Sequence, residues 1–178
     1  MRVRLLVLGE SPPRLAANVL ATLPPPFVGG EVSHAALPVT RCYDVQRAQV
    51  DATRLLDVMP ESPPGWACVG ITAADLFVEP LAYVFGLSVL GGRKGVVSWA
   101  RLRPDETSED VLLVTTRRLS VEVVHELGHA IGLIHCVVPD CAMHRSLWPE
   151  AVDLKRAAFC PSCFEGLQAA TGEVDQMA

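Results

Sequence analysis

Basic residues are neither abundant nor clustered in this sequence. The chain has 15 Lys and Arg among its 178 residues, interspersed with 20 Asp and Glu, and its formal net charge is −5. Proteins that follow a phosphate backbone or an anionic membrane surface carry a block or stripe of Lys and Arg. The sequence therefore predicts neither a nucleic acid nor a membrane as a partner.

An apolar run long enough to cross a bilayer is also absent. The most apolar region, residues 66–92, is interrupted by Asp75, Glu79 and Pro80, whereas a transmembrane helix needs about 20 consecutive apolar residues. The N-terminal sequence "MRVRLLVLGESPP" has too short an apolar core for a secretory signal, and no small-residue cleavage site follows it. We therefore expect a cytoplasmic protein, in which the six cysteines are thiols or metal ligands rather than disulfides.

Repeats and low-complexity segments are absent, and half of the residues are hydrophobic, which is typical of a globular domain. The chain is long enough to bury one hydrophobic core without stabilisation by disulfide bonds or metal ions, so we expect a single domain, residues 1–178. Strands and helices alternate and end in a strand pair, which predicts an α/β fold with a mixed sheet and helices packed on it. Strands are predicted at residues 3–8, 31–37 and 66–72 and as a pair within residues 83–102, and helices at residues 13–23 and 45–59 and from the polar segment 104–110 to about Leu133.

The sequence pattern changes after Gly132, where the helical periodicity fades and cysteines appear. We therefore divide the domain into two subdomains. Residues 1–132 form the N-terminal subdomain with the sheet and the long helix, and residues 133–178 form a small, irregular C-terminal subdomain.

Three of the five histidines lie within the eleven residues "HELGHAIGLIH". Positions four apart share one face of a helix, so His125 and His129 can direct their imidazoles at one ion, while Glu126 can reach a water at the open coordination position. His135 can join them only if the helix ends first, and Gly132 can adopt the left-handed conformation that ends helices. The pattern predicts an open zinc site, in which the ion lowers the pKa of water to about 7. A chance match in an amphipathic helix is the alternative for the bare pentapeptide, but it accounts poorly for Gly132 and His135 in register.

The same stretch resembles the metzincin metallopeptidases, and Met143 lies where those enzymes place the methionine of a tight turn that forms an apolar floor under the metal. Within the metzincins, the "HC" after the helix, Cys141, Met143 and the later "CPSC" resemble the archaemetzincins. The segments "VGITAADL", "YVFGLSVLGGRKGVVSWARLR" and "DLKRAAFCPSC" are similar to that family as well, so the resemblance covers roughly residue 66 to the C-terminal region. It implies a zincin-like metzincin fold and an edge strand at residues 83–90 that pairs with extended substrate.

Four of the six cysteines form two short-spaced pairs, Cys136 with Cys141 and Cys160 with Cys163. Two such pairs can close a tetrahedral zinc site, because each pair supplies one edge of the tetrahedron. This second ion would be structural, stapling the C-terminal subdomain to the end of the catalytic segment, and the resemblance to archaemetzincins implies the same two-zinc arrangement. A redox "CPSC" pair is an alternative, but it expects a preceding strand and leaves two cysteines unexplained.

The sequence thus predicts a zinc-dependent peptidase with two zinc ions per chain, one catalytic and one structural, and a peptide or protein substrate. Glu126 would take a proton from water and pass it to the leaving amine. The alternative is a non-catalytic zinc protein that binds peptides or partners through the same cleft, although a carboxylate beside an open coordination position argues against it. Hydrolysis of a non-peptide amide would use the same residues. The metal would stabilise the oxyanion, and the resemblance to metzincins implies that a tyrosine near the metal can add a second donor. Both tyrosines of this chain, Tyr43 and Tyr83, precede the helix, so the second oxyanion donor stays unassigned.

Overall fold

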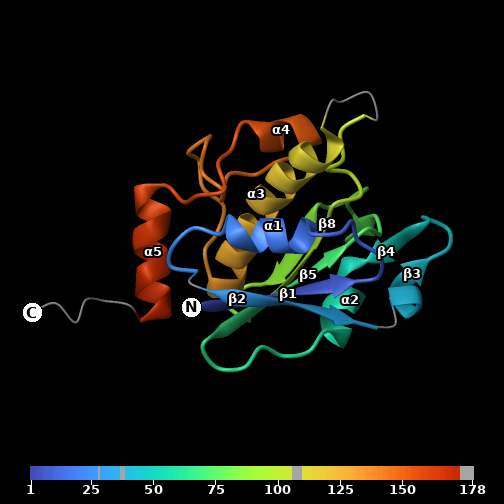
Figure 1. Ribbon diagram of the computed structural model, residues 1–178, viewed down its shortest axis with the longest axis horizontal. Helices are drawn as coiled ribbons and strands as arrows, with labels where there is room; N and C mark the ends of the chain where they lie inside the picture. The colour runs from blue at the N-terminus through green and yellow to red at the C-terminus, as the bar shows by residue number, and fades with distance from the viewer. Residues whose placement is uncertain (28, 37–38, 106–109, 173–178) are drawn as a thin grey trace, which may run out of the picture.

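The computed structural model describes residues 1–27, 29–36, 39–105 and 110–172. A five-stranded sheet with strand order β2-β1-β5-β8-β7 lies at its centre (Figure 1). Strands β2, β1, β5 and β8 run parallel, and the edge strand β7 runs antiparallel to β8. A smaller sheet has the order β3-β4-β6. The predicted α/β fold with a mixed sheet is confirmed.

The strands are β1 (Arg2–Leu8), β2 (Gly30–Ala35), β3 (Tyr43–Asp44), β4 (Gln49–Asp51), β5 (Trp66–Thr72), β6 (Leu76–Phe77), β7 (Gly86–Val89) and β8 (Lys94–Ser98). The helices are α1 (Leu15–Ala21), α2 (Ala52–Val58), α3 (Val111–Ile131), α4 (Pro149–Asp153) and α5 (Pro161–Thr171), with a short 3-10 helix at Val39–Cys42. No helix in the described ranges is both long enough and apolar enough to cross a membrane.

Side chains of the central sheet alternate between two apolar layers, as the period of two in a β-strand requires. In β1, Val3, Leu5 and Val7 belong to the core that includes residues of α1 and α3, whereas Leu6 and Leu8 belong to the core that includes residues of α2. Figure 1 shows α1 and α3 on one side of the sheet and α2 on the other. The long helix α3 also contacts β5, β7 and β8, so it lies across the half of the sheet that ends in the edge strand.

Helix α3 begins and ends with clear signals in the sequence. The Asp110 carboxylate accepts a hydrogen bond of 2.8 Å from the backbone N–H of Leu113, which caps the N-terminus. At the other end Gly132 has a φ of 111°, and its N–H bonds to the carbonyls of Gly128 and His129. The helix stops one residue before this left-handed glycine, two residues before the predicted end at Leu133, and the chain turns back there as expected.

The helix predicted at residues 45–59 is wrong in its first half. Residues Gln49–Asp51 form β4, in which Val50 pairs with Tyr43 on one side and Leu76 on the other. Pairing with a neighbouring strand on each side overrides the helical spacing of the apolar residues. The Asp51 side chain then caps the shorter helix α2 by accepting the N–H groups of Thr53 and Arg54.

Two other boundaries differ from the prediction. Helix α1 begins at Leu15, two residues after the predicted start at Pro13, because Arg14 before it has a positive φ of 67°. The C-terminal segment, predicted to be irregular, contains α4 and α5. Both helices have proline in the first turn, at Pro149 and Pro161, a position that favours the start of a helix. The predicted strand pair within residues 83–102 is confirmed as β7 and β8, and the last residue of the strand predicted at 31–37 lies outside the described residues.

Candidate active site

The three predicted histidines come together at the C-terminal end of α3. The candidate ligand nitrogens of His125, His129 and His135 all lie within 4.8 Å of one another, and the Nε2 atoms of His125 and His129 are 3.1 Å apart. Tetrahedral zinc with Zn–N bonds of about 2.0–2.1 Å would place its nitrogens about 3.3 Å apart. The cluster therefore fits a zinc ion with small adjustments. Because the helix stops before Gly132, the returning chain brings the His135 ring to 4.8 Å from the His129 ring, between centroids.

Backbone carbonyls fix the orientation of two of these rings. His125 Nδ1 donates to the carbonyl of Ala142 and His129 Nδ1 donates to the carbonyl of Leu133, each over 2.7 Å. The Nε2 atoms of both rings are then left without a proton and face the cluster, as metal ligation requires. Burial lowers the pKa of all three imidazoles, that of His125 well below its ordinary value, so the neutral form that binds metal is favoured.

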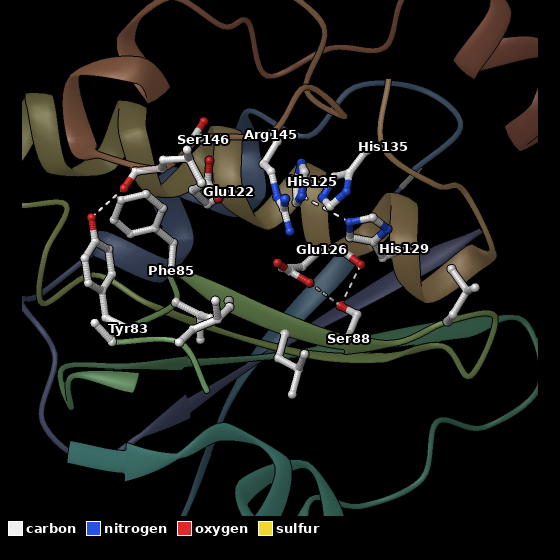
Figure 2. Close-up of a pocket in the computed structure, with 17 residues that line it drawn as sticks. Tyr83, Phe85, Ser88, Glu122, His125, Glu126, His129, His135, Arg145 and Ser146 are labelled. Atoms are coloured by element: carbon white, nitrogen blue, oxygen red, sulfur yellow. Dashed lines mark hydrogen bonds between the residues drawn. The ribbon is translucent and has the colours of Figure 1, made fainter. Parts of the chain in front are cut away.

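Glu126 lies beside the histidines and is held by the edge strand. The Ser88 hydroxyl on β7 donates to Glu126 Oε2 over 2.7 Å and also lies 2.9 Å from the Glu126 backbone carbonyl (Figure 2). Burial raises the pKa of Glu126 to about 8, against the opposing effect of the Ser88 hydrogen bond. A cation held by the neighbouring histidines would favour the carboxylate form.

Two glycines leave the space that this arrangement needs. A Cβ at Gly86 would lie 2.7 Å from Glu126 Cγ and 2.8 Å from the carbonyl oxygen of Val96, and a Cβ at Gly95 would overlap the Ser88 hydroxyl. Either contact is too close for an ordinary side chain, and the Val96 carbonyl belongs to the sheet and cannot rotate away. The glycines of β7 and β8 thus allow the edge strand to approach the carboxylate closely.

The site opens into a cleft of about 470 Å³ between α3, the edge strand with the residues before it, and the segment 145–147. Its rim carries three exposed leucines, Leu81, Leu90 and Leu147. The Tyr83 hydroxyl donates to the backbone carbonyl of Leu147 over 2.5 Å and so links the two sides of the cleft (Figure 2). Within the described residues, β7 pairs with β8 alone and is an edge of the central sheet.

Met143 packs directly against the helix that carries the histidines. Its side chain is fully buried, and a Cβ added at Gly128 would overlap its sulfur. The methionine therefore forms an apolar support on α3 between His125 and His129. Its role as an apolar floor under a metal stays a prediction.

A buried ion pair ties the methionine segment to α3. Lys155 Nζ lies 2.8 Å from Glu122 Oε1, and the side chains are 0% and 5% exposed, respectively. The same ammonium group donates to the carbonyls of His144 over 3.1 Å and Ala142 over 3.4 Å. Since the Ala142 carbonyl also accepts from His125, one backbone oxygen joins the ion pair to a candidate metal ligand.

The four predicted cysteines form a second cluster. Their sulfurs lie within 4.8 Å of one another, and the sulfurs of Cys136 and Cys160 are 3.7 Å apart. Tetrahedral zinc with Zn–S bonds of about 2.3 Å would place its sulfurs about 3.8 Å apart. An interaction with the Cys163 backbone lowers the pKa of Cys160, at the N-cap position of α5, whereas burial raises the pKa of Cys141 and of Cys163. The spacing of the sulfurs fits a closed zinc site.

Sequence reasoning did not find four side chains that line or support the cleft: Ser88, Glu122, Arg145 and Lys155. Ser88 and Lys155 reach α3 from 38 and 33 residues away, respectively. No local pattern signals such contacts. Ser88 and Lys155 do lie within segments whose sequences resemble those of archaemetzincins.

A histidine cluster with a buried carboxylate beneath an edge strand, on this mixed sheet, defines the class of zinc metallopeptidases. The family model of peptidase family M54 matches residues 41–169. The archaemetzincin of Halobacterium salinarum is 35% identical over 171 residues, covering 92% of this chain and 97% of the relative. The crystal structure of the Methanopyrus kandleri archaemetzincin superimposes with a TM-score of 0.83 at 31% identity, covering 97% of this chain and 96% of that one. The Archaeoglobus fulgidus archaemetzincin, solved with malonate, gives a TM-score of 0.80 at 27% identity, with 93% and 99% coverage. The chain belongs to the archaemetzincins, peptidase family M54, as its sequence motifs predicted.

Proposed function

We propose that this protein hydrolyses peptide bonds with a catalytic zinc held by His125, His129 and His135 and with Glu126 as the general base. The observation that carries the proposal is the convergence of three imidazoles, two of them oriented by backbone carbonyls, in an open cleft with a carboxylate beside them. A purely structural site has no use for that carboxylate or for an open coordination position.

The residues of the chain divide the chemistry among them. Zinc in this site would polarise the scissile carbonyl and lower the pKa of a water to about 7. Glu126 takes the proton of the attacking water and delivers it to the nitrogen of the leaving amine. Ser88 holds the Glu126 carboxylate by its hydrogen bond, so that the base stays aligned during both transfers.

An extended peptide is the substrate that suits this cleft. Strand β7 is the edge of the central sheet and pairs with β8 on one side within the described residues. Main-chain hydrogen bonds to its other side would bind a peptide as an added strand, irrespective of sequence. The exposed leucines of the rim favour apolar side chains in that peptide.

We propose a second, structural zinc held by Cys136, Cys141, Cys160 and Cys163. It would staple residues 133–178 to the end of α3 within one metallopeptidase domain, residues 1–178. Thiolate ligands of this kind persist in a reducing compartment, which supports a cytoplasmic location. We expect two zinc ions per chain in the wild type and one in a variant with both Cys160 and Cys163 changed to Ser. Elemental mass spectrometry of the purified proteins measures the zinc bound per chain.

The test of the proposed function is the dependence of peptide cleavage on zinc. Fluorogenic peptides with apolar residues on both sides of the scissile bond are incubated with the purified protein, with the chelated protein and with the chelated protein reloaded with zinc. We expect cleavage to disappear on chelation and to return with about one equivalent of zinc more than the structural site holds. Tight peptide binding without cleavage in the reloaded protein would instead indicate a non-catalytic zinc protein that binds peptides. Hydrolysis confined to non-peptide amides would indicate an amide hydrolase that does not act on peptides.

A further inference from the structure

Arg145 stands over the histidine cluster. It follows Met143 by two residues and lines the same cleft as the three histidines and Glu126. Figure 2 shows its side chain reaching from the upper segment down past the histidines, with the guanidinium directed toward Glu126.

The guanidinium has no protein partner in the described parts of the chain, where none of its nitrogens makes a hydrogen bond or an ion pair. The two carboxylates of the cleft are already engaged, Glu122 with Lys155 and Glu126 with Ser88. The Ser146 hydroxyl also lacks a hydrogen-bond partner, but it is covered by protein atoms and points away from the histidines (Figure 2). Arg145 therefore offers its donors to an anion that arrives with the substrate.

The backbone on either side of Arg145 is anchored. The His144 N–H donates to the Cys141 carbonyl over 3.0 Å, and the His144 carbonyl accepts from Lys155 over 3.1 Å. Beyond Arg145, the Leu147 carbonyl accepts from the Tyr83 hydroxyl over 2.5 Å. The attachment point of the guanidinium is thus fixed from both sides, so an anion in the cleft is met by a donor whose backbone is already in place.

Neither tyrosine can serve as this donor in the observed arrangement. Tyr83 lines the cleft, but its hydroxyl is already donated to the Leu147 carbonyl. Tyr43 lies in the separate three-stranded sheet and does not line the cleft. The donor that complements the histidine site must come from another residue type.

We propose that Arg145 is the second oxyanion donor of this peptidase, an inference that rests on the proposed function. When the water oxygen bonds to the scissile carbon, the π electrons of the carbonyl move onto its oxygen, and the charged guanidinium hydrogen-bonds to that oxyanion. The charge returns to the carbonyl as the C–N bond breaks and the amine takes the proton from Glu126. Arg145 is a catalytic residue in this account, because it contacts the reacting oxygen. The arginine side chain suits this role, since it carries a positive charge and presents several donors in one plane.

The test compares Arg145→Met and Arg145→Lys with the wild type, and uses Arg103→Met as the matched control. Arg103 is exposed and lies outside the cleft, so its replacement removes the same charge without touching the site. Three quantities are measured for each protein: zinc content, kcat and KM for one cleaved peptide, and the inhibition constant of the phosphinic analogue of that peptide. The peptide is used with a free and with an amidated C-terminus.

Loss of one aligned oxyanion donor costs about 10²–10³ in kcat, and for an exposed guanidinium we expect about a 10- to 100-fold loss in Arg145→Met. In Arg145→Met, KM and zinc content should stay within about twofold of the wild type, and the affinity for the phosphinic analogue should fall by the same factor as kcat/KM. Arg145→Lys should restore part of the loss. This pattern is expected of a contact made only in the transition state.

An unchanged kcat in Arg145→Met, with the wild type active, would overturn the inference and leave the proposed function intact. So would a loss that appears in KM and vanishes when the peptide is amidated, because Arg145 would then bind the C-terminal carboxylate of the substrate. A zinc-loaded wild type that cleaves no peptide would contradict the proposed function itself.

Discussion

Replacing Lys155 by Met should destabilise the protein far more than any ordinary surface substitution. The change leaves the Glu122 carboxylate 5% exposed and without its cation, and it frees the carbonyls of His144 and Ala142. Removing one partner of a buried ion pair costs about 3–5 kcal/mol. For a chain of this size about 1 kcal/mol shifts the Tm by about 2–4 °C, so a fall of roughly 6–20 °C is expected.

The chain contains its own control, because its other lysine also forms a short ion pair. Lys94 Nζ lies 2.6 Å from Glu61 Oε1, but the Glu61 side chain is 80% exposed. Without Lys94 the glutamate is simply hydrated, so Lys94→Met should cost about 0–1 kcal/mol. Urea unfolding of both variants at equal zinc loading measures the difference, which comes from the burial of the carboxylate and not from the length of the ion pair.

The loss in Lys155→Met should also depend on pH. Burial already raises the pKa of Glu122 above its ordinary value, and removal of the cation raises it further. The folded state then binds more protons than the unfolded state above the unfolded pKa, so the destabilisation is smallest near about pH 4.5 and grows as the pH rises. Adding Glu122→Gln should recover at least half of the loss at neutral pH. A Lys155→Met variant as stable as Lys94→Met, or a loss independent of pH, would refute this reasoning.

Two further substitutions test the supports of the site. Gly128→Ala should lower the free energy of unfolding by about 1–3 kcal/mol, because its methyl group overlaps the buried Met143 sulfur. The control Gly166→Ala meets only the end of a leucine side chain at 3.2 Å and should be neutral or stabilising by up to about 1 kcal/mol. Thermal unfolding measures both effects, and equal effects would contradict the packing argument. Ser88→Ala should lower kcat about 3- to 30-fold with KM and zinc content unchanged, since it frees the Glu126 carboxylate without touching substrate; a change in KM alone would mean that Ser88 binds the peptide instead.

The parts of the site that could be predicted from the sequence are those whose geometry is local. His125 and His129 share a helix face, and the left-handed Gly132 returns the chain to His135 within a few residues. The cysteine cluster follows similarly from two short spacings. Helical spacing gave the wrong prediction where strand pairing decides the structure, as at Val50, which lies in β4 because it pairs with strands on both sides.

The supports of the site could not be predicted because they are long-range contacts between unremarkable residues. Ser88 reaches Glu126 only because β7 is the edge strand next to α3, and that depends on the strand order of the whole sheet. Lys155 looks like a surface residue in the sequence, and only the fold buries it against Glu122. Arg145 lies on a loop after Met143, where a charged side chain carries no sequence signal of its own.

The central claim is that the histidine cluster and Glu126 form the catalytic centre of a zinc peptidase. Mass-spectrometric profiling of a diverse peptide library with the zinc-loaded wild type and with zinc-loaded Glu126→Ala tests it most directly. The account predicts peptide cleavage by the wild type that disappears in the variant while the zinc content of the two proteins stays equal. Equal cleavage by both proteins, or none by a wild type that carries its full zinc, would contradict it.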